Sequence, residues 1–174
     1  MITFIEGPDT AGKNELYEQC KLKLKYTDVI YYDICKDEEV LMLLGVSEDR
    51  IINELGIIIS TLLKIALENK HLNIISCGGP MLLAEHAFNT NDAHKIMNAY
   101  SVLSSGLYQN ANMISVSSQY DDKNRREIYR NIGSRNMSIM TDAGKFNNYR
   151  IFINKDSDVN RELFLNDVRT LINK

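Results

Sequence analysis

The chain has 174 residues, of which 44% are hydrophobic and 25% charged, so it is long and apolar enough to form one compact domain over residues 1–174. Its formal net charge of -3 argues against nucleic acid or an anionic membrane as a partner. Its three scattered cysteines lack C-x-x-C spacing, which argues against both a zinc site and a disulfide framework and fits a reducing compartment. The chain also starts with an apolar strand in place of a signal peptide and has no bilayer-spanning apolar run, so we expect a cytoplasmic protein.

Five apolar runs of strand length alternate with helical patterns along the chain. The predicted strands are Ile2–Ile5, Val29–Tyr32, Leu72–Ile75, Met113–Val116 and Ile151–Ile153. The predicted helices span 13–25, 48–69, 80–89, 92–107, 121–131, 134–145 and 158–173. This alternation predicts a three-layer α/β fold, in which helices flank a five-stranded parallel sheet on both faces. A ligand then binds where the carboxyl ends of the strands meet.

The first predicted strand runs directly into a glycine-rich loop, Gly7-x-x-x-x-Gly12-Lys13, and then into the first helix. Glycine accepts backbone geometry that a Cβ forbids, so successive amides can turn toward phosphate oxygens in front of the helix N-terminus. The Lys13 ammonium then reaches the β- and γ-phosphates. The spacing predicts a P-loop that binds ATP. Its expected nucleotide contacts are Gly7, Thr10, Ala11, Gly12, Lys13, Asn14 and Glu15.

Asn14 stands where a P-loop normally offers a Ser or Thr hydroxyl to Mg²⁺. An amide oxygen also coordinates a hard cation or its water, but more weakly. Asn14 is therefore predicted to be a weak Mg²⁺ ligand, and the loop favours nucleotide binding more strongly than fast catalysis.

The segment Phe4–Lys13 resembles the strand and P-loop signature of thymidylate kinases, Glu-Gly-x-Asp-x-Ala/Ser-Gly-Lys-Ser/Thr. The segment Ala87–Asn89 is similar to the one with which these kinases bind the pyrimidine base, and residues at about 119–147 stand where the family has its LID. The resemblance covers most of the chain. It implies a P-loop NTPase fold with a short LID, and Mg²⁺-dependent transfer of the γ-phosphate of ATP to a deoxynucleoside monophosphate, with dTMP or another pyrimidine dNMP as the first expectation. The small size and trimmed LID resemble phage-encoded members, which act in the host cytoplasm.

Phosphoryl transfer depends on positioned cations more than on a proton acceptor, and this makes Lys13 the first expected catalytic residue. In the resembled family a further arginine comes from the P-loop or from the LID, and Thr10 occupies the loop position here. Arg126 and Arg130 share a helix face at i, i+4 spacing and are expected to supply the charge, with Arg125 next. The alternative for these arginines is a solvated helix face.

Four residues are expected on the acceptor side. A carboxylate at Asp9 would repel phosphate, so we expect it to point to the acceptor, where the resemblance implies a contact with the deoxyribose hydroxyl; a local Asx turn is the alternative. The resemblance assigns Phe88 and Asn89 to the base, although an aromatic residue on an apolar helix also fits a core position. The resemblance also implies Arg50 as the contact for the acceptor phosphate, on the condition that the helix predicted at 48–69 is extended by about two turns.

The chain departs from the family after the third strand, where thymidylate kinases carry Asp-Arg and this sequence reads Ser76–Gly79. The glycines of this segment are expected to leave extra room, and Cys77 is expected to be a buried structural thiol. Two alternative functions therefore stay open. One is a deoxynucleoside kinase in which Asp33 or Glu38 activates the 5'-hydroxyl, and the other is a nucleotide-binding protein with little catalysis.

The predicted helix at 48–69 is apolar on nearly every side. The residues that produce this pattern are Ile57, Ile58, Ile59, Leu62 and Leu63. A helix of this kind requires burial on more than one side, which predicts a homodimer through it, as in the resembled family.

Overall fold

The computed structural model describes residues 1–7, 11–90, 92–103, 106–118 and 146–172. Its strands are β1 (Ile2–Glu6), β2 (Val29–Asp33), β3 (Asn73–Cys77), β4 (Ala111–Ser118) and β5 (Asn148–Asn154). Its α-helices are α1 (Lys13–Lys23), α2 (Glu38–Leu43), α3 (Glu48–Glu68), α4 (Pro80–Asn89), α5 (Ala93–Leu103) and α7 (Asp158–Ile172), with 3₁₀ turns at Ile34–Lys36 and Gly106–Asn110.

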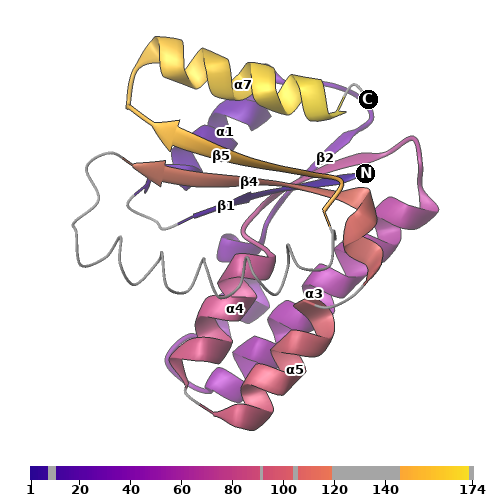
Figure 1. Cartoon of the computed structure of the whole chain (residues 1–174), viewed down its shortest axis with the longest axis vertical. Coiled ribbons are helices and arrows are strands. Elements are labelled where there is room, and N and C mark those ends of the chain that lie inside the picture. The colour runs from indigo at the N-terminus through magenta and orange to yellow at the C-terminus, as the bar shows by residue number, and fades with distance from the viewer. Residues whose placement is uncertain (8–10, 91, 104–105, 119–145, 173–174) are drawn as a thin grey trace.

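The described strands form one parallel sheet in the order β2-β3-β1-β4-β5 (Figure 1). β1 lies at its centre between β3 and β4, so the loop that follows β1 emerges between two other strand ends. The predicted five-stranded parallel α/β sheet is confirmed. This order places the loop after β1 at the carboxyl edge, where open α/β sheets bind their ligands.

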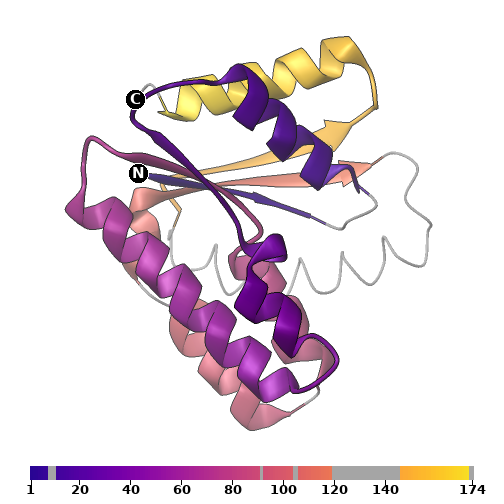
Figure 2. The same cartoon turned by 180° about the vertical axis from the view of Figure 1, so that it is seen from behind.

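Two layers of helices cover the sheet, and the alternation of side chains along β1 shows how. Ile2 and Phe4 point into the core formed with α3, α4 and α5, whereas Ile5 points into the core formed with α1 and α7. Figures 1 and 2 show α1 and α7 on one face and the α3–α5 bundle extending away from the other. Both faces of β1 are therefore buried. This packing fixes the position of the strand end from which the glycine-rich loop starts.

Ser47 caps the N-terminus of α3, because its side chain accepts a hydrogen bond from the amide of Arg50. Ile59 and Leu63 are buried in the chain's own core, whereas Ile57 is 60% exposed. The sheet, α4 and α5 thus cover most of the apolar surface of α3 within one chain. No helix among the described residues is both long and apolar enough to cross a membrane.

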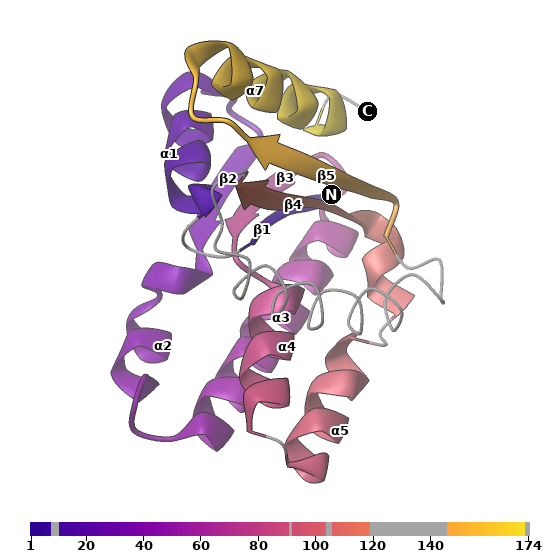
Figure 3. The ribbon, with the colours of Figure 1, turned by 60° about the vertical axis from the view of Figure 1, so that its left-hand side comes forward.

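The turn at Ile34–Lys36 and helix α2 were not predicted from the sequence. Asp37 caps α2 by accepting hydrogen bonds from the amides of Glu39 and Val40 at 3.0 and 3.2 Å. Figure 3 shows α2 beside α3, below the end of β2. The helix predicted at 92–107 was too long, because α5 ends at Leu103 and a 3₁₀ turn begins at Gly106. The helices predicted at 121–131 and 134–145 lie outside the described residues.

Candidate functional site

The glycine-rich loop begins and ends with residues that must be glycine. Gly7 and Gly12 have φ angles of +140° and +75°, which side chains rarely tolerate. A Cβ on Gly7 would overlap the carbonyl oxygen of Val116 in β4, and one on Gly12 would lie 2.5 Å from the Nδ2 atom of Asn154. The ends of β4 and β5 therefore pack directly against the loop. Residues 8–10, which include the predicted Asp9 and Thr10, lie outside the described residues.

Lys13 is the first residue of α1 and is only 3% exposed. Its Nζ atom donates a hydrogen bond to the Sγ atom of Cys35 at 3.6 Å. The ammonium thus lies at the carboxyl end of the sheet, close to the turn that follows β2. Glu15, in the first turn of α1, forms an ion pair with Arg161 of α7 at 2.9 Å, which occupies its carboxylate at the surface.

Asn14 points toward β3. Its Oδ1 atom accepts a hydrogen bond from the Sγ atom of Cys77 at 3.3 Å. Cys77 is the last residue of β3, so the amide lies at the strand end where thymidylate kinases, by the resemblance above, carry their carboxylate. The expectation that Cys77 is buried is confirmed, because none of its surface is exposed.

Cys35 and Asp33 meet Cys77 at the neighbouring ends of β2 and β3. Asp33 is paired in register with Cys77, and its Oδ1 atom accepts a hydrogen bond from the amide of Cys35 at 3.1 Å. A hydrogen bond from Cys77 and the positive charge of Lys13 lower the pKa of Cys35 to about 7 against the opposing effect of burial. The neighbouring Cys35 and burial raise the pKa of Cys77. Cys35, rather than Cys77, therefore carries the greater share of negative charge, beside the Lys13 ammonium.

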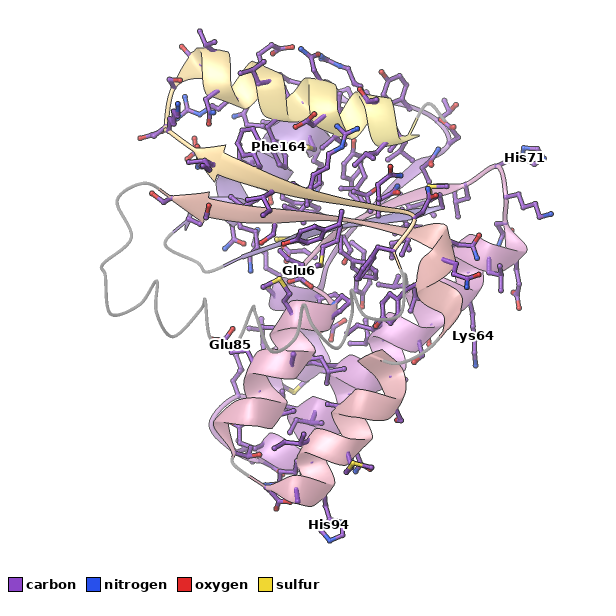
Figure 4. All side chains as sticks on the ribbon, in the orientation of Figure 1. Glu6, Lys64, His71, Glu85, His94 and Phe164 are labelled. Atoms are coloured by element: carbon purple, nitrogen blue, oxygen red, sulfur yellow. The ribbon has the colours of Figure 1, made fainter. Side chains whose placement is uncertain are left out.

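Glu6 is another titratable group near the loop, and it is buried. It lies below the sheet, near the start of α4 (Figure 4). Its Oε1 atom accepts a hydrogen bond from the amide of Met81 at 2.9 Å. Burial raises the pKa of Glu6 to about 8, although Lys13 and this hydrogen bond act in the opposite direction. Near neutral pH this carboxyl group is mostly protonated, so it does not cancel the positive charge of Lys13.

The two glycines after β3 do not leave extra room, contrary to the expectation from the sequence. Gly78 has a φ angle of +82°, and a Cβ there would lie 3.1 Å from the Sγ atom of Cys35. A Cβ on Gly79 would overlap the ring of Phe4 and lie 3.0 Å from the Oε1 atom of Glu6. Close packing against β1 and the 34–36 turn therefore explains why small residues occupy this segment.

The other predicted site residues lie further along the chain. Arg50 is exposed in the first turn of α3, and Phe88 and Asn89 are the last two residues of α4, with side chains outside the described part of the structure. The LID candidates Arg125, Arg126 and Arg130 lie in residues 119–145 and are likewise outside it. The sequence assigned no role to Cys35 or Glu6, since only the folded chain brings them next to the loop.

A parallel sheet in the order β2-β3-β1-β4-β5, with a glycine-rich loop between its central strand and the first helix, defines the α/β architecture of the chain. Thymidylate kinase from Ehrlichia chaffeensis is similar to this chain with a TM-score of 0.57 and 15% sequence identity, covering 98% of this chain and 97% of that chain. Shikimate kinase from Acinetobacter baumannii, solved in complex with shikimate, has a TM-score of 0.49 and 12% identity, covering 99% and 93%. No family model and no curated protein matches the sequence.

Proposed function

We propose that the chain is an ATP-dependent P-loop kinase that transfers the γ-phosphate of ATP to a deoxynucleoside monophosphate. The observation that carries this proposal is the loop between β1 and α1, with Gly7 and Gly12 in conformations that favour glycine and Lys13 directly after them. Backbone amides at such a loop and helix N-terminus bind phosphate, and the lysine ammonium stabilises the charge of the transferred phosphoryl group.

The Mg²⁺ that accompanies ATP is held mainly by phosphate oxygens and water, and it neutralises charge on the β- and γ-phosphates. Asn14 offers an amide oxygen at the start of α1, and an oxygen donor fits a hard cation. Because this oxygen already accepts a hydrogen bond from Cys77 at 3.3 Å, we expect Asn14 to contribute weakly, as a ligand of the ion or of its water.

A pyrimidine deoxynucleoside monophosphate, with dTMP first, is the proposed acceptor. The support is the resemblance of Phe4–Lys13 and Ala87–Asn89 to thymidylate kinases, together with the similarity of the fold to a solved thymidylate kinase. The proposed acceptor contacts remain Asp9, Phe88, Asn89 and Arg50, and the proposed catalytic cations are Lys13, Arg126, Arg130 and Arg125. Free nucleotides as substrates fit a cytoplasmic enzyme, which in a phage-encoded protein acts in the host.

An ADP-release assay over a panel of ribo- and deoxynucleoside monophosphates and nucleosides tests the activity. We expect turnover with deoxynucleoside monophosphates and none with nucleosides. ATP binding in calorimetry without turnover on any acceptor would leave a nucleotide-binding protein with little catalysis. A folded protein that takes up no ATP, with or without Mg²⁺, would overturn the kinase proposal altogether.

The position of Asp33 favours a second candidate, a deoxynucleoside kinase. Its side chain is 13% exposed, and its carboxylate lies within 4.8 Å of the Sγ atom of Cys35, which Lys13 contacts at 3.6 Å. A hydroxyl acceptor in front of Lys13 could therefore give its proton to Asp33. Glu38, the other carboxylate offered for this role, is exposed at the start of α2. Nucleoside turnover that Asp33→Asn abolishes and Glu38→Gln preserves would establish this candidate.

We further infer a homodimer through the helix predicted at 48–69, which is α3. Ile57 is 60% exposed beside a groove of about 470 Å³ that α3 shares with α5. Light scattering with size-exclusion chromatography tests it, with Ile57→Glu expected to give monomers. Leu22→Glu is the matched control, since Leu22 is 61% exposed on α1, on the other side of the sheet. A monomeric unmodified protein would contradict the inference.

A further inference from the structure

Three side chains with metal-ligating atoms converge where β2 and β3 end. A carboxylate oxygen of Asp33 and the Sγ atoms of Cys35 and Cys77 all lie within 4.8 Å of one another. The parallel register pairs Asp33 with Cys77. The 3₁₀ turn that follows β2, capped by Asp33, places Cys35 next to this pair. The cluster is thus a product of backbone geometry at two adjacent strand ends.

We propose that Asp33, Cys35 and Cys77 form a binding site for a soft divalent cation of the zinc class. Thiolates select zinc-class ions, whereas Mg²⁺ takes oxygen ligands only. In tetrahedral coordination with Zn–S bonds of about 2.3 Å, two sulfur ligands lie roughly 3.8 Å apart, which is compatible with ligand atoms that all lie within 4.8 Å of one another. Three protein ligands leave a fourth position for water or an anionic oxygen.

The charges around the cluster fit a divalent cation. Metal binding would release the thiol protons of Cys35 and Cys77 to solvent. The three ligands would then carry three negative charges, which a divalent cation and the adjacent Lys13 ammonium would balance. Both Cys77 and Lys13 are nearly inaccessible to solvent, so unbalanced charge there would be unfavourable. The Oδ2 atom of Asp33 also meets Lys36 at 3.3 Å, but a carboxylate has enough lone pairs for a metal as well.

The partners of the ligands also suit the site. The amide of Cys35 holds the Oδ1 atom of Asp33 at 3.1 Å, and outer hydrogen bonds of this kind orient metal ligands. Lys13 donates a hydrogen bond to the Sγ atom of Cys35 at 3.6 Å, which favours its thiolate form. A metal at the cluster would also occupy Asp33, so this proposal opposes the use of Asp33 as the base of a deoxynucleoside kinase.

Cobalt titration of the full chain tests the site without any nucleotide, so its outcome does not depend on the kinase proposal. Protein reduced with a phosphine and freed of metal by a chelator is titrated with Co²⁺. We expect a thiolate-to-cobalt charge-transfer band in the near ultraviolet and the strong visible bands of a tetrahedral ion, both removed by equimolar Zn²⁺. Cys35→Ser should weaken the charge-transfer band and lower affinity by at least roughly 10-fold, since changes in outer-shell partners alone cost that much.

Cys20→Ala is the matched control, because Cys20 is a fully buried thiol of α1 outside the cluster. It should bind Co²⁺ like the unmodified protein. Asp33→Asn keeps both sulfurs and should retain the charge-transfer band with weaker affinity, and circular dichroism shows whether each variant is folded. Cobalt spectra without a sulfur band, a band unchanged by Cys35→Ser, or a Cys35–Cys77 disulfide that persists in the reductant would each overturn the proposal.

Discussion

Asn154 at the end of β5 lies directly over Gly12 at the start of α1. Its Nδ2 atom donates a hydrogen bond to the carbonyl oxygen of Ala11 at 2.9 Å, and the same atom lies 2.5 Å from where a Cβ on Gly12 would stand. The last strand of the sheet therefore contacts the end of the glycine-rich loop, and a side chain at Gly12 would require Asn154 to move.

Gly12→Ala should weaken ATP binding by at least roughly 10-fold, because the methyl group must push Asn154 aside while the backbone stays in a left-handed conformation. Gly45→Ala is the matched control: Gly45 has nearly the same φ angle, +74°, but a Cβ there would meet nothing within 4 Å. Calorimetry with ATP measures binding. Urea unfolding measures the loss of stability that both variants share because their backbone is left-handed at the substituted position. Equal ATP affinities for the two variants would argue against a phosphate site at this loop.

Lys13→Ala should lower turnover by roughly 100-fold or more, because the ammonium stabilises charge that develops on the phosphoryl oxygens. Lys70→Ala is the control, since Lys70 is exposed just before the amino end of β3, whereas the glycine-rich loop lies at the carboxyl edge of the sheet. Steady-state kinetics with the best acceptor of the panel provides the measurement. A Lys13→Ala enzyme that keeps its kcat would remove this lysine from the mechanism.

Arg126→Ala should lower kcat more than it raises KM for ATP, because a LID cation acts mainly in the transition state. Arg125→Ala is expected to have a smaller effect, since the helix predicted from the sequence at 121–131 would put Arg126 and Arg130 on one face and Arg125 on another. The same kinetic assay reports both variants. A larger loss of kcat in Arg125→Ala would reverse the order of the two arginines.

Asn14→Ser should raise kcat and lower the Mg²⁺ concentration at half-maximal rate, because a hydroxyl replaces the weaker amide ligand. The change also removes the acceptor of the hydrogen bond from Cys77 at 3.3 Å. Titration of Mg²⁺ at saturating ATP measures the effect. An unchanged Mg²⁺ dependence would mean that another group positions the ion.

Glu6→Gln should make stability less dependent on pH. The ordinary pKa of this carboxyl group is 4.5, and in the folded chain it is about 8, so the folded state binds more protons between these values. The contribution of Glu6 to the free energy of unfolding is therefore greatest below pH 4.5 and is lost as pH rises to about 8, by at most roughly 1.4 kcal/mol per pH unit.

Glutamine keeps the size of Glu6 and an oxygen for the amide of Met81, but it does not ionise. Urea unfolding at a series of pH values should show that the free energy of unfolding of Glu6→Gln rises relative to that of the unmodified protein as pH rises. Glu38→Gln, at an exposed position in α2, is the control, and its curve of unfolding free energy against pH should be parallel to that of the unmodified protein. Parallel curves for Glu6→Gln as well would show that Glu6 titrates normally.

The sheet and the glycine-rich loop could be predicted because their signals are local. Continuous apolar runs mark the strands, and the spacing from Gly7 to Lys13 marks the loop. Helix α2 was missed because it has six residues and Asp37 is its main local signal. The contact of Lys13 with Cys35 depends on the order of β1, β2 and β3 in the sheet, which periodicity does not encode.

The close packing around Gly79 also could not be predicted from the neighbouring sequence. The sequence shows a pair of glycines after β3, and such a pair predicts an open turn. Only the pairing of β3 with β1 brings the ring of Phe4 and the carboxyl group of Glu6 against Gly79. Gly79 is therefore small because its neighbours are close.

The helices α3, α4 and α5 extend as a bundle away from the sheet, whereas the glycine-rich loop packs against the strand ends and α1 (Figures 1 and 2). Substitutions on the outer surface of this bundle leave the contacts of Gly7 and Gly12 with Val116 and Asn154 untouched. Changes confined to that outer surface would therefore alter the bundle while the strand ends and α1 keep their packing around Gly7 and Gly12.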